Sequence, residues 1–258
     1  MNRKRSDIME RRSKLLELIR QAREGELNVE QTAARLKVSA VTLRRDLALL
    51  EEEGLVRRAY GRVTPVEKGP EPESFSPDLT PADSVSRIAR LAAGFVENGD
   101  VIFINTSRTA LRMLRFVEAE NVTVITNNTM AVNVPRRDDM TIVLTGGELR
   151  YPKYAMVGAV AQQSLRFIQA NKAFLGCGGL SVGRGVTTEH FAEVAVDQVM
   201  LTSVSGPVYL LAAHNKLGKD ANFSCGEIRL IRELVTDRDA DPEQLRAIQE
   251  AGVVVHLA

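Results

Sequence analysis

The sequence contains no tryptophan, two cysteines and three histidines among its 258 residues. The cysteines, Cys177 and Cys225, provide neither a disulfide framework nor a zinc-finger spacing, which excludes small disulfide-stapled and zinc-ribbon proteins. We expect both thiols to be reduced. The histidines, His190, His214 and His256, are scattered along the chain. We therefore expect no metal site, and nothing in the sequence calls for a cofactor.

Long apolar runs are also missing. No segment approaches the roughly 20 apolar residues that a membrane span requires. Basic residues at the N-terminus are not followed by an apolar stretch, so the pattern is not that of a secretory signal. Apolar residues make up 44% of the chain and charged residues 26%, as in ordinary globular proteins. These features predict a cytoplasmic protein with no membrane partner.

The chain has almost no net charge, but its charges are unevenly distributed. Residues 1–66 contain 15 basic and 10 acidic residues, whereas the remainder contains 19 basic and 23 acidic residues. A basic small end on an acidic larger body indicates that one end meets a polyanion. Residues 64–81 hold five prolines and few large apolar side chains, which is linker composition. We therefore predict domains at 1–66 and 82–258, joined by a linker at 67–81.

The first domain has the pattern of a winged helix-turn-helix. Apolar periodicity predicts helices over 7–22, 29–36 and 39–53, with Ser39 as the N-cap of the third. A short hairpin over 55–58 and 62–66 would form the wing. Leu43, Leu47 and Leu50 share one face of the third helix, which leaves its N-terminal polar residues pointing outward.

That outward face is the predicted DNA-reading surface. The N-terminal part of a recognition helix enters the major groove, where arginine bonds guanine and small side chains contact phosphates or base edges. Arginines on the wing would track the phosphate backbone. The predicted DNA-binding residues are Ser39, Val41, Thr42, Arg44, Arg45, Arg57, Arg58 and Arg62.

The second domain alternates strands and helices. Continuous Val/Ile/Leu runs predict strands at 101–105, 122–126, 141–147, 172–179, 208–213, 233–237 and 253–257. Helical stretches at 84–97, 109–118, 159–167, 191–203 and 242–250 lie between several of them. This alternation predicts an α/β domain with a mostly parallel sheet covered on both faces.

Polar and glycine-rich loops follow the predicted strands, where ligands bind in open α/β sheets. Hydroxyls, backbone N–H groups and cations in such loops suit a phosphate or carboxylate. The predicted effector-binding residues are Asn105, Thr106, Ser107, Arg108, Thr109, Thr126, Asn127, Gly146, Gly147, Gly178, Thr187 and Lys216.

Two runs carry a family resemblance. RLKVSAVTLRRDLALLEEEGLVRRAYGRV resembles the DNA-binding domain of the DeoR family of bacterial regulators, with Gly61-Arg62 in place of the family's usual double glycine. Residues 75–258 resemble that family's sensor domain through Asn98-Gly99-Asp100, Thr126-Asn127, Gly146-Gly147, the strand 172–176, Gly185-Val186-Thr187 and Lys216-Leu217-Gly218. The resemblance implies a fold shared with ribose-5-phosphate isomerase and CoA transferases, and an effector that is a phosphorylated sugar or related metabolite.

Two loops depart from the family pattern. Family members commonly carry Asp-Ser-Gly-Thr-Thr at the first loop, where this chain has 105–109 as Asn-Thr-Ser-Arg-Thr, and Asp-Ser-Ser-Lys where it has Ala213-His214-Asn215-Lys216. An acid is absent at both places and Arg108 is added. This predicts a more electropositive pocket, which either binds a more highly charged anion or is filled by Arg108 itself.

The sequence thus predicts a sequence-specific transcriptional regulator, a repressor of a sugar or carbohydrate-related operon that binds double-stranded operator DNA as a homodimer or homotetramer. Two alternatives stay open. The second domain could serve only for oligomerisation, giving a constitutive DNA-binding protein. It could instead be an isomerase-like enzyme, but Glu148 and Glu189 are the only carboxylates near the glycine loops and neither has an acid partner in the sequence, so we expect no enzymatic activity.

Overall fold

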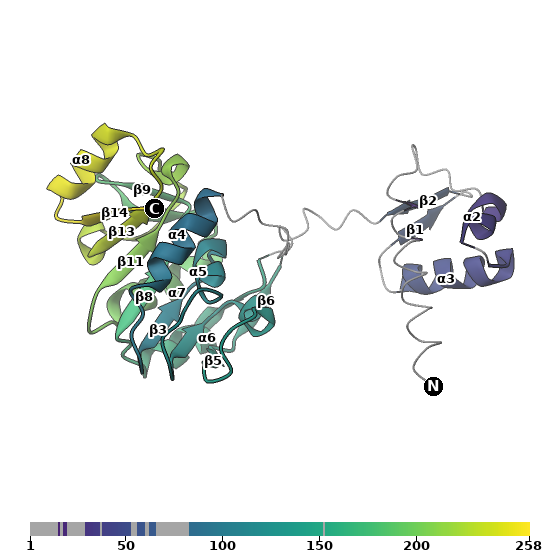
Figure 1. Ribbon diagram of the computed structural model, residues 1–258, viewed down its shortest axis with the longest axis horizontal. Helices are drawn as coiled ribbons and strands as arrows, with labels where there is room; N and C mark the ends of the chain where they lie inside the picture. The colour runs from purple at the N-terminus through teal and green to yellow at the C-terminus, as the bar shows by residue number, and fades with distance from the viewer. Residues whose placement is uncertain are drawn as a thin grey trace. The chain divides into compact units, whose positions relative to one another are not determined.

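The computed structural model describes residues 15, 18–19, 29–36, 38–52, 56–59, 62–65, 83–151 and 153–258. The chain divides into two compact units, Met1–Glu71 and Pro72–Ala258 (Figure 1). The predicted linker at 67–81 and most of the predicted helix at 7–22 lie outside the described residues. None of the helices in the described ranges combines the length and apolar character that a membrane span requires.

The smaller unit contains the predicted helix-turn-helix and hairpin. Its elements are α2 (Val29–Arg35), α3 (Ala40–Glu52), β1 (Val56–Ala59) and β2 (Arg62–Pro65). Their apolar faces meet in one small core together with residues of the helical segment before α2; its buried members are Leu15, Ile19, Ala33, Leu43, Leu47, Leu50, Val56 and Val63. The helix pair and hairpin therefore share one buried core, as their apolar periodicity predicts.

The ends of α3 and the hairpin follow local chemistry. The Thr42 backbone N–H donates to Ser39 Oγ at 3.1 Å, which confirms Ser39 as the N-cap of α3. The hairpin strands pair antiparallel, with Ala59 opposite Arg62. Both strands lie within one residue of their predicted bounds, and each contributes one valine, Val56 or Val63, to the buried core.

The larger unit is built on a seven-stranded sheet. Its strands are β3 (Val101–Ile104), β4 (Thr123–Thr126), β5 (Thr141–Leu144), β8 (Lys172–Leu175), β11 (Val208–Leu211), β13 (Glu233–Thr236) and β14 (Val254–Leu257). Their order is β14-β13-β11-β8-β3-β4-β5, and all six pairings are parallel. The predicted strands thus form one parallel sheet, and the α/β fold class is confirmed.

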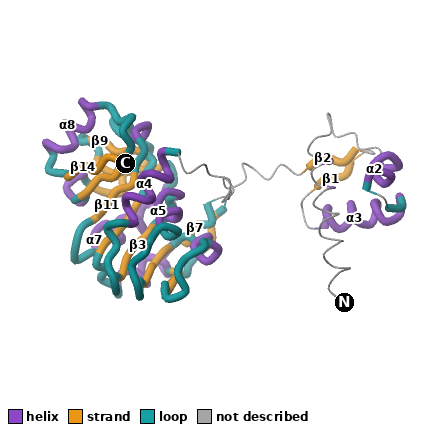
Figure 2. Tube along the Cα trace, viewed as in Figure 1, coloured by secondary structure: helices purple, strands orange, loops and turns teal. Residues whose placement is uncertain are grey.

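Both faces of this sheet are covered, because successive strand residues point into two different cores. Phe103 and Leu210 lie in one core, while the neighbouring Ile102 and Leu211 lie in the other. One core includes α6 (Gly158–Arg166), α7 (Phe191–Thr202) and α8 (Pro242–Glu250), and the other includes α4 (Ser84–Ala93) and α5 (Arg108–Met113). Figure 2 shows the strands lying between these helices. Burial on both sides explains why the strands read as continuous apolar runs.

Two of the helices end earlier than predicted. After α5, the N–H groups of Arg115 and Phe116 bond the carbonyls three residues back, at 3.1 and 2.9 Å. After α4, Gly94 and Phe95 do the same at 3.1 Å each. This tightening of the last turn terminates an α-helix although the apolar pattern continues.

Five short antiparallel strands were not predicted. They are β6 (Glu148–Arg150), β7 (Ala155–Val157), β9 (Gly179–Ser181), β10 (Gly185–Thr188) and β12 (Phe223–Gly226). The predicted strand over 141–147 ends at Leu144 because Gly146 and Gly147 adopt positive φ angles of 72° and 108°, and β6 follows at once. Strand β10 pairs with both β9 and β12, and β6 pairs with β7.

Candidate nucleic-acid interface and strand-end crevice

The exposed face of the N-terminal half of α3 combines an apolar side chain with two arginines. Val41 is 74% exposed although it is apolar, and Arg44 and Arg45 on the same face are exposed as well. Leu43 and Leu47 on the opposite face are at most 1% exposed. A DNA major groove offers thymine methyl groups to such a valine and guanine edges to the arginines.

The structure describes the other predicted DNA-binding residues less completely. The hydroxyls of Ser39 and Thr42 bond each other at 2.9 Å, so at most one of them can donate outward. Arg57 and Arg58 lie on β1 and Arg62 begins β2, but their side chains lie outside the described residues. Their phosphate contacts stay a prediction.

The predicted effector residues gather at one edge of the sheet. They follow β3, β4, β5, β8 and β11, which are consecutive neighbours in the parallel sheet, so their carboxyl-terminal loops lie side by side. We call these loops, residues 105–109, 126–128, 145–147, 176–179 and 212–217, the strand-end crevice. Thr187 joins it because its backbone carbonyl accepts the Gly178 N–H at 2.8 Å.

Several of the predicted side chains are occupied by bonds inside the protein. Asn105 is buried; its amide donates to Gly176 O at 3.0 Å and to Asp197 Oδ1 at 3.2 Å, while its Oδ1 accepts the Gly176 N–H. Thr106 Oγ1 donates to Glu193 Oε2 at 2.8 Å. These two residues attach the β3–α5 loop to α7 and to the end of β8, which is a positioning role.

Ser107 and Gly176 fit each other closely. Ser107 is the N-cap of α5, and its Oγ accepts the Ala110 N–H at 3.3 Å. A Cβ built on Gly176 would lie 2.2 Å from that Oγ, so only glycine permits this approach. The pair therefore fixes where α5 begins and how the backbone of its first turn is oriented.

The next two loops are also internally braced. Thr126 Oγ1 accepts the Asn128 N–H at 3.0 Å, and the Asn127 amide donates to Met156 O at 3.2 Å. The side-chain Oδ1 of Asn127 is buried and has no hydrogen-bond partner among the described residues. Thr187 Oγ1 donates to Gly179 O and accepts the Ala221 N–H. Gly147 cannot be replaced without strain, because a Cβ there would lie 2.5 Å from Val157 O.

The cationic members are more accessible. Arg108 is exposed and Lys216 is half-buried, while Thr109 is half-buried at the start of α5. Partial burial and the neighbouring Arg112 lower the pKa of Arg108, which stays charged at neutral pH. The part of the crevice that can meet an anion thus consists of these cations, the Thr109 hydroxyl and backbone N–H groups.

Two buried carboxylates on α7 were missed in the sequence. Glu193 and Asp197 are 5% and 6% exposed, and Lys153 Nζ lies 3.6 Å from Glu193 Oε2. Burial, reinforced by the charge of Glu193, raises the pKa of Asp197 to about 7. The signal was available, since the two acids lie four residues apart on a mostly apolar helix. The prediction of an electropositive pocket did not take these two carboxylates into account.

Both thiols border the same acids. Burial raises the pKa of Cys177 to about 12, and Cys225 Sγ lies 3.7 Å from Asp197 Oδ2. Burial also raises the pKa of Cys225, so both cysteines are protonated at neutral pH and are poor nucleophiles. Neither thiol acts as a nucleophile in the functions proposed below.

His214 lies beside two acids. Its Nδ1 lies 2.7 Å from Asp237 Oδ1, and ligand atoms of His214, Asp237 and Asp239 lie within 4.8 Å of one another. The Asp237 oxygens also accept the backbone N–H groups of His214 and Asp239. Burial opposes ionisation of Asp237, yet these bonds outweigh it and lower the pKa of the carboxyl. The cluster is thus fully explained as a brace between the loops after β11 and β13.

The carboxylates considered for catalysis do not form an acid–base pair. Glu148 lies on β6, is paired with Arg150 at 2.8 Å and has a side chain that is 66% exposed. Glu189 is exposed in the loop before α7. Neither has the buried, partnered environment that tunes a catalytic carboxylate.

Both parts of the chain are similar to domains of known proteins. Residues 11–68 match the DeoR-like helix-turn-helix domain, and residues 82–238 match the DeoR C terminal sensor domain. The transcriptional repressor GlcR of Bacillus subtilis is 30% identical over 231 residues, which cover 89% of this chain and 88% of that protein. The glycerol-3-phosphate regulon repressor of Escherichia coli K12 is 26% identical over 250 residues, with 96% and 98% covered. The full-length sorbitol operon regulator SorC from Klebsiella pneumoniae, a solved structure, is 13% identical, with 96% and 99% covered and a TM-score of 0.42.

Proposed function

Because the chain belongs to the DeoR family of DNA-binding transcriptional regulators, we propose that it represses a sugar or carbohydrate-related catabolic operon, with α3 as the helix that reads the operator. The observation that carries this proposal is the outward face of α3. Val41, Arg44 and Arg45 are exposed together at its N-terminal half, while its leucines are buried. Names of relatives support the regulatory role, since GlcR and the Escherichia coli relative are both named repressors.

Recognition divides between bases and phosphates. Arg44 and Arg45 bond guanine edges, and Val41 contacts a thymine methyl group. Arg57, Arg58 and Arg62 on the wing contact phosphates and give the complex its salt dependence. Ser39 and Thr42 supply one hydroxyl to a phosphate at the start of the helix.

A binding site selected from random duplexes by the full-length chain tests this division. Arg45→Ala should weaken binding to the selected site about 10-fold or more and relax the preference at one base pair. Arg58→Ala should weaken binding to selected and random duplexes alike and reduce the salt slope by about one. Arg246→Ala, an exposed arginine on α8 in the larger unit, is the matched control. Equal behaviour of Arg45→Ala and the control would refute the proposal.

The effector we propose is a small anionic metabolite, of which a phosphorylated sugar is the favoured example. Arg108, Lys216 and the Thr109 hydroxyl provide the polar contacts, and Gly146 lets the backbone approach the ligand. Gly147 and Gly178 shape the loops instead, because a Cβ on either would lie within 3.2 Å of other protein atoms. The Escherichia coli relative is named for a glycerol-3-phosphate regulon, which is consistent with a phosphorylated effector. Binding in one arrangement of the DNA-binding units shifts the population away from the operator-bound form.

Operators are usually read by more than one winged helix, so we propose a homodimer or homotetramer. Two large apolar side chains on one face of α6 and its C-cap support this assembly: Val160 is 62% exposed and Phe167 is 82% exposed. Light scattering of the full-length chain and of Phe167→Ser tests it. A monomeric wild type, or an unchanged mass in the variant, would remove this face from the interface.

A second candidate function is regulation without an effector. It is favoured by the internal hydrogen bonds of Asn105, Thr106 and Thr187, which occupy polar groups that an effector would otherwise bond. Fluorescence anisotropy of the selected duplex separates the two. Release of DNA by glycerol 3-phosphate, ribose 5-phosphate or another sugar phosphate, weakened in Arg108→Gln, supports effector control. No response to a broad panel of phosphorylated metabolites favours the constitutive regulator.

A further inference from the structure

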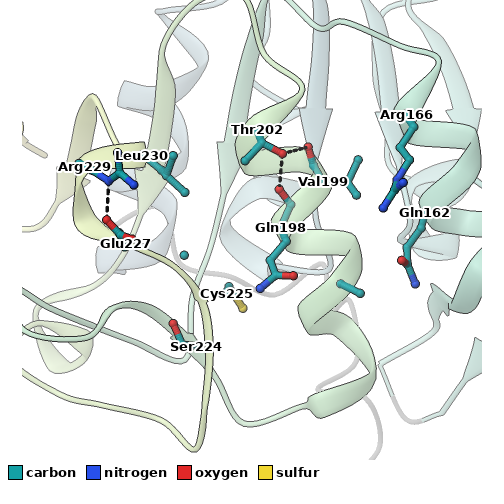
Figure 3. Close-up of a pocket in the computed structure, with 12 residues that line it drawn as sticks. Gln162, Arg166, Gln198, Val199, Thr202, Ser224, Cys225, Glu227, Arg229 and Leu230 are labelled. Carbon is teal, nitrogen blue, oxygen red and sulfur yellow. Dashed lines mark hydrogen bonds and ion pairs between the residues drawn. The ribbon is translucent and has the colours of Figure 1, made fainter.

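A pocket lies outside the strand-end crevice. It has a volume of about 460 Å³ and is formed by α6, α7, β12 and the 3-10 turn Ile228–Leu230. Figure 3 shows Arg166 and Gln162 on one side, Glu227 and Arg229 on the other, and Gln198, Val199 and Thr202 of α7 between them. A volume of this size accommodates a metabolite.

The pocket and the crevice use opposite faces of α7. At about 100° per residue, Ala195, Gln198, Val199 and Thr202 share one face of the helix, whereas Glu193 and Asp197 lie on the reverse face. The reverse face holds the β3–α5 loop through Thr106 and Asn105. The pocket is therefore a separate site, with α7 as the wall that divides it from the crevice.

Among the described residues, some polar side chains of the pocket already form hydrogen bonds or ion pairs within the protein, and others do not. Arg229 is paired with Glu227, so the charge of this pair is neutralised. The Thr202 hydroxyl donates to the backbone carbonyl of Gln198 at 2.8 Å. Arg166, at the end of α6, is exposed, and its side chain forms no hydrogen bond or ion pair with any residue in the described part of the chain. Arg166 is thus the available cation, with the Gln162 side chain beside it (Figure 3).

The floor of the pocket has a different character. Val199 and Cys225 are 8% and 1% exposed, and Leu230 lines the wall beside them. Burial raises the pKa of Cys225, so its thiol is neutral and acts as an apolar surface. A ligand that fits has an anionic end for Arg166, groups that bond the side-chain amides of Gln162 and Gln198, and an apolar part that covers the floor.

We propose that this pocket, named here the α6–α7 pocket, is a second binding site for a small organic anion, a carboxylate or a phosphate ester, held by Arg166. The site is independent of the effector crevice. A ligand bound there contacts α7, whose reverse face carries the bonds to the β3–α5 loop.

Titration calorimetry of the full-length chain tests the site with three probes: inorganic phosphate, ribose 5-phosphate and citrate. At least one probe should bind wild type, and Arg166→Gln should weaken that binding about 10- to 100-fold, as expected for loss of a charged hydrogen bond. Arg246→Gln, an exposed arginine on α8, is the matched control and should leave the affinity unchanged. Arg108→Gln should leave this Arg166-dependent binding unchanged, even where it weakens a separate binding of ribose 5-phosphate in the crevice, and this difference separates the two sites.

A fluorescent reporter adds a readout confined to the pocket. The chain contains no tryptophan, so Ser224→Trp places a single indole at the pocket, and Gln249→Trp on α8 serves as its control. The probe that binds in calorimetry should give a saturable change in the first variant and none in the second. Absence of binding by all three probes, or full survival in Arg166→Gln of the binding of every probe that binds wild type, overturns the proposal.

Discussion

Replacing Asp197 with asparagine should change how the stability of the larger unit depends on pH. In the folded protein the pKa of Asp197 is raised from 3.8 to about 7, mainly by burial and further by Glu193. Between these values the folded state binds more protons than the unfolded state. The stability that this carboxyl contributes is therefore fully present below pH 3.8 and is lost as pH rises through about 7.

The magnitude follows from the shift. A difference of about three pKa units corresponds to about 4 kcal/mol over the whole window. Between pH 5.5 and pH 8.5 about 2 kcal/mol of it is lost, equivalent to roughly 4–8 °C in Tm for a unit of this size. The introduced asparagine side chain would keep a neutral oxygen for the Asn105 amide but could not ionise. The stability of the variant relative to that of wild type should therefore increase as pH rises.

Thermal unfolding followed by circular dichroism at pH 5.5, 7.0 and 8.5 measures this gain. The Tm of Asp197→Asn minus that of wild type should rise by about 4–8 °C across the range. Asp138→Asn, an exposed aspartate, is the control and should run parallel to wild type. Parallel curves for Asp197→Asn would refute the reasoning, because they would mean that Asp197 is ionised throughout, as an ordinary aspartate is.

Three further predictions concern packing and charge. In urea unfolding, Gly176→Ala should lower the free energy of unfolding by about 1–3 kcal/mol, since its methyl would meet Ser107 Oγ. Gly183→Ala, where a Cβ meets nothing within 4 Å, should leave the free energy of unfolding nearly unchanged in the same measurement. Lys172→Met should lower the free energy of unfolding by about 3 kcal/mol, because it leaves the buried Asp100 carboxylate, now 2.9 Å from Lys172 Nζ, without its ion-pair partner. Lys219→Met on the surface is the control, and equal urea midpoints for the two variants would contradict the argument. Val41→Ser should leave stability within about 0.5 kcal/mol of wild type while weakening operator binding in anisotropy, and unchanged binding would remove Val41 from the interface.

The parallel sheet was predictable because its strands are buried on both faces. Runs such as Val101–Ile104 and Val208–Leu211 are apolar at every position, and only a covered parallel sheet requires that. The short strands β9 and β10 were not predictable in the same way. They are three and four residues long, contain Gly179 and Gly185, and pair antiparallel outside the sheet. No periodicity develops over so short a length.

For the strand-end crevice, the sequence predicts where the loops lie but not the contacts of their side chains. That polar loops follow the strands could be predicted from the alternation of elements, and the sheet order brings them to one edge. Whether a given side chain faces a ligand or braces the fold could not be predicted. Asn105 bonds Asp197, 92 residues away, and Thr106 bonds Glu193, 87 residues away. Only the fold reveals such partners.

The most direct test of the central claim is anisotropy of a labelled duplex, selected by the chain from random sequences, against wild type, Arg45→Ala and the control Arg246→Ala. The account predicts tight, salt-dependent binding by wild type and the control. Arg45→Ala should bind the selected duplex at least about 10-fold more weakly and should lose most of its discrimination against random duplex. Selected-site affinity and discrimination that are the same in Arg45→Ala as in wild type would contradict the claim that α3 reads the operator.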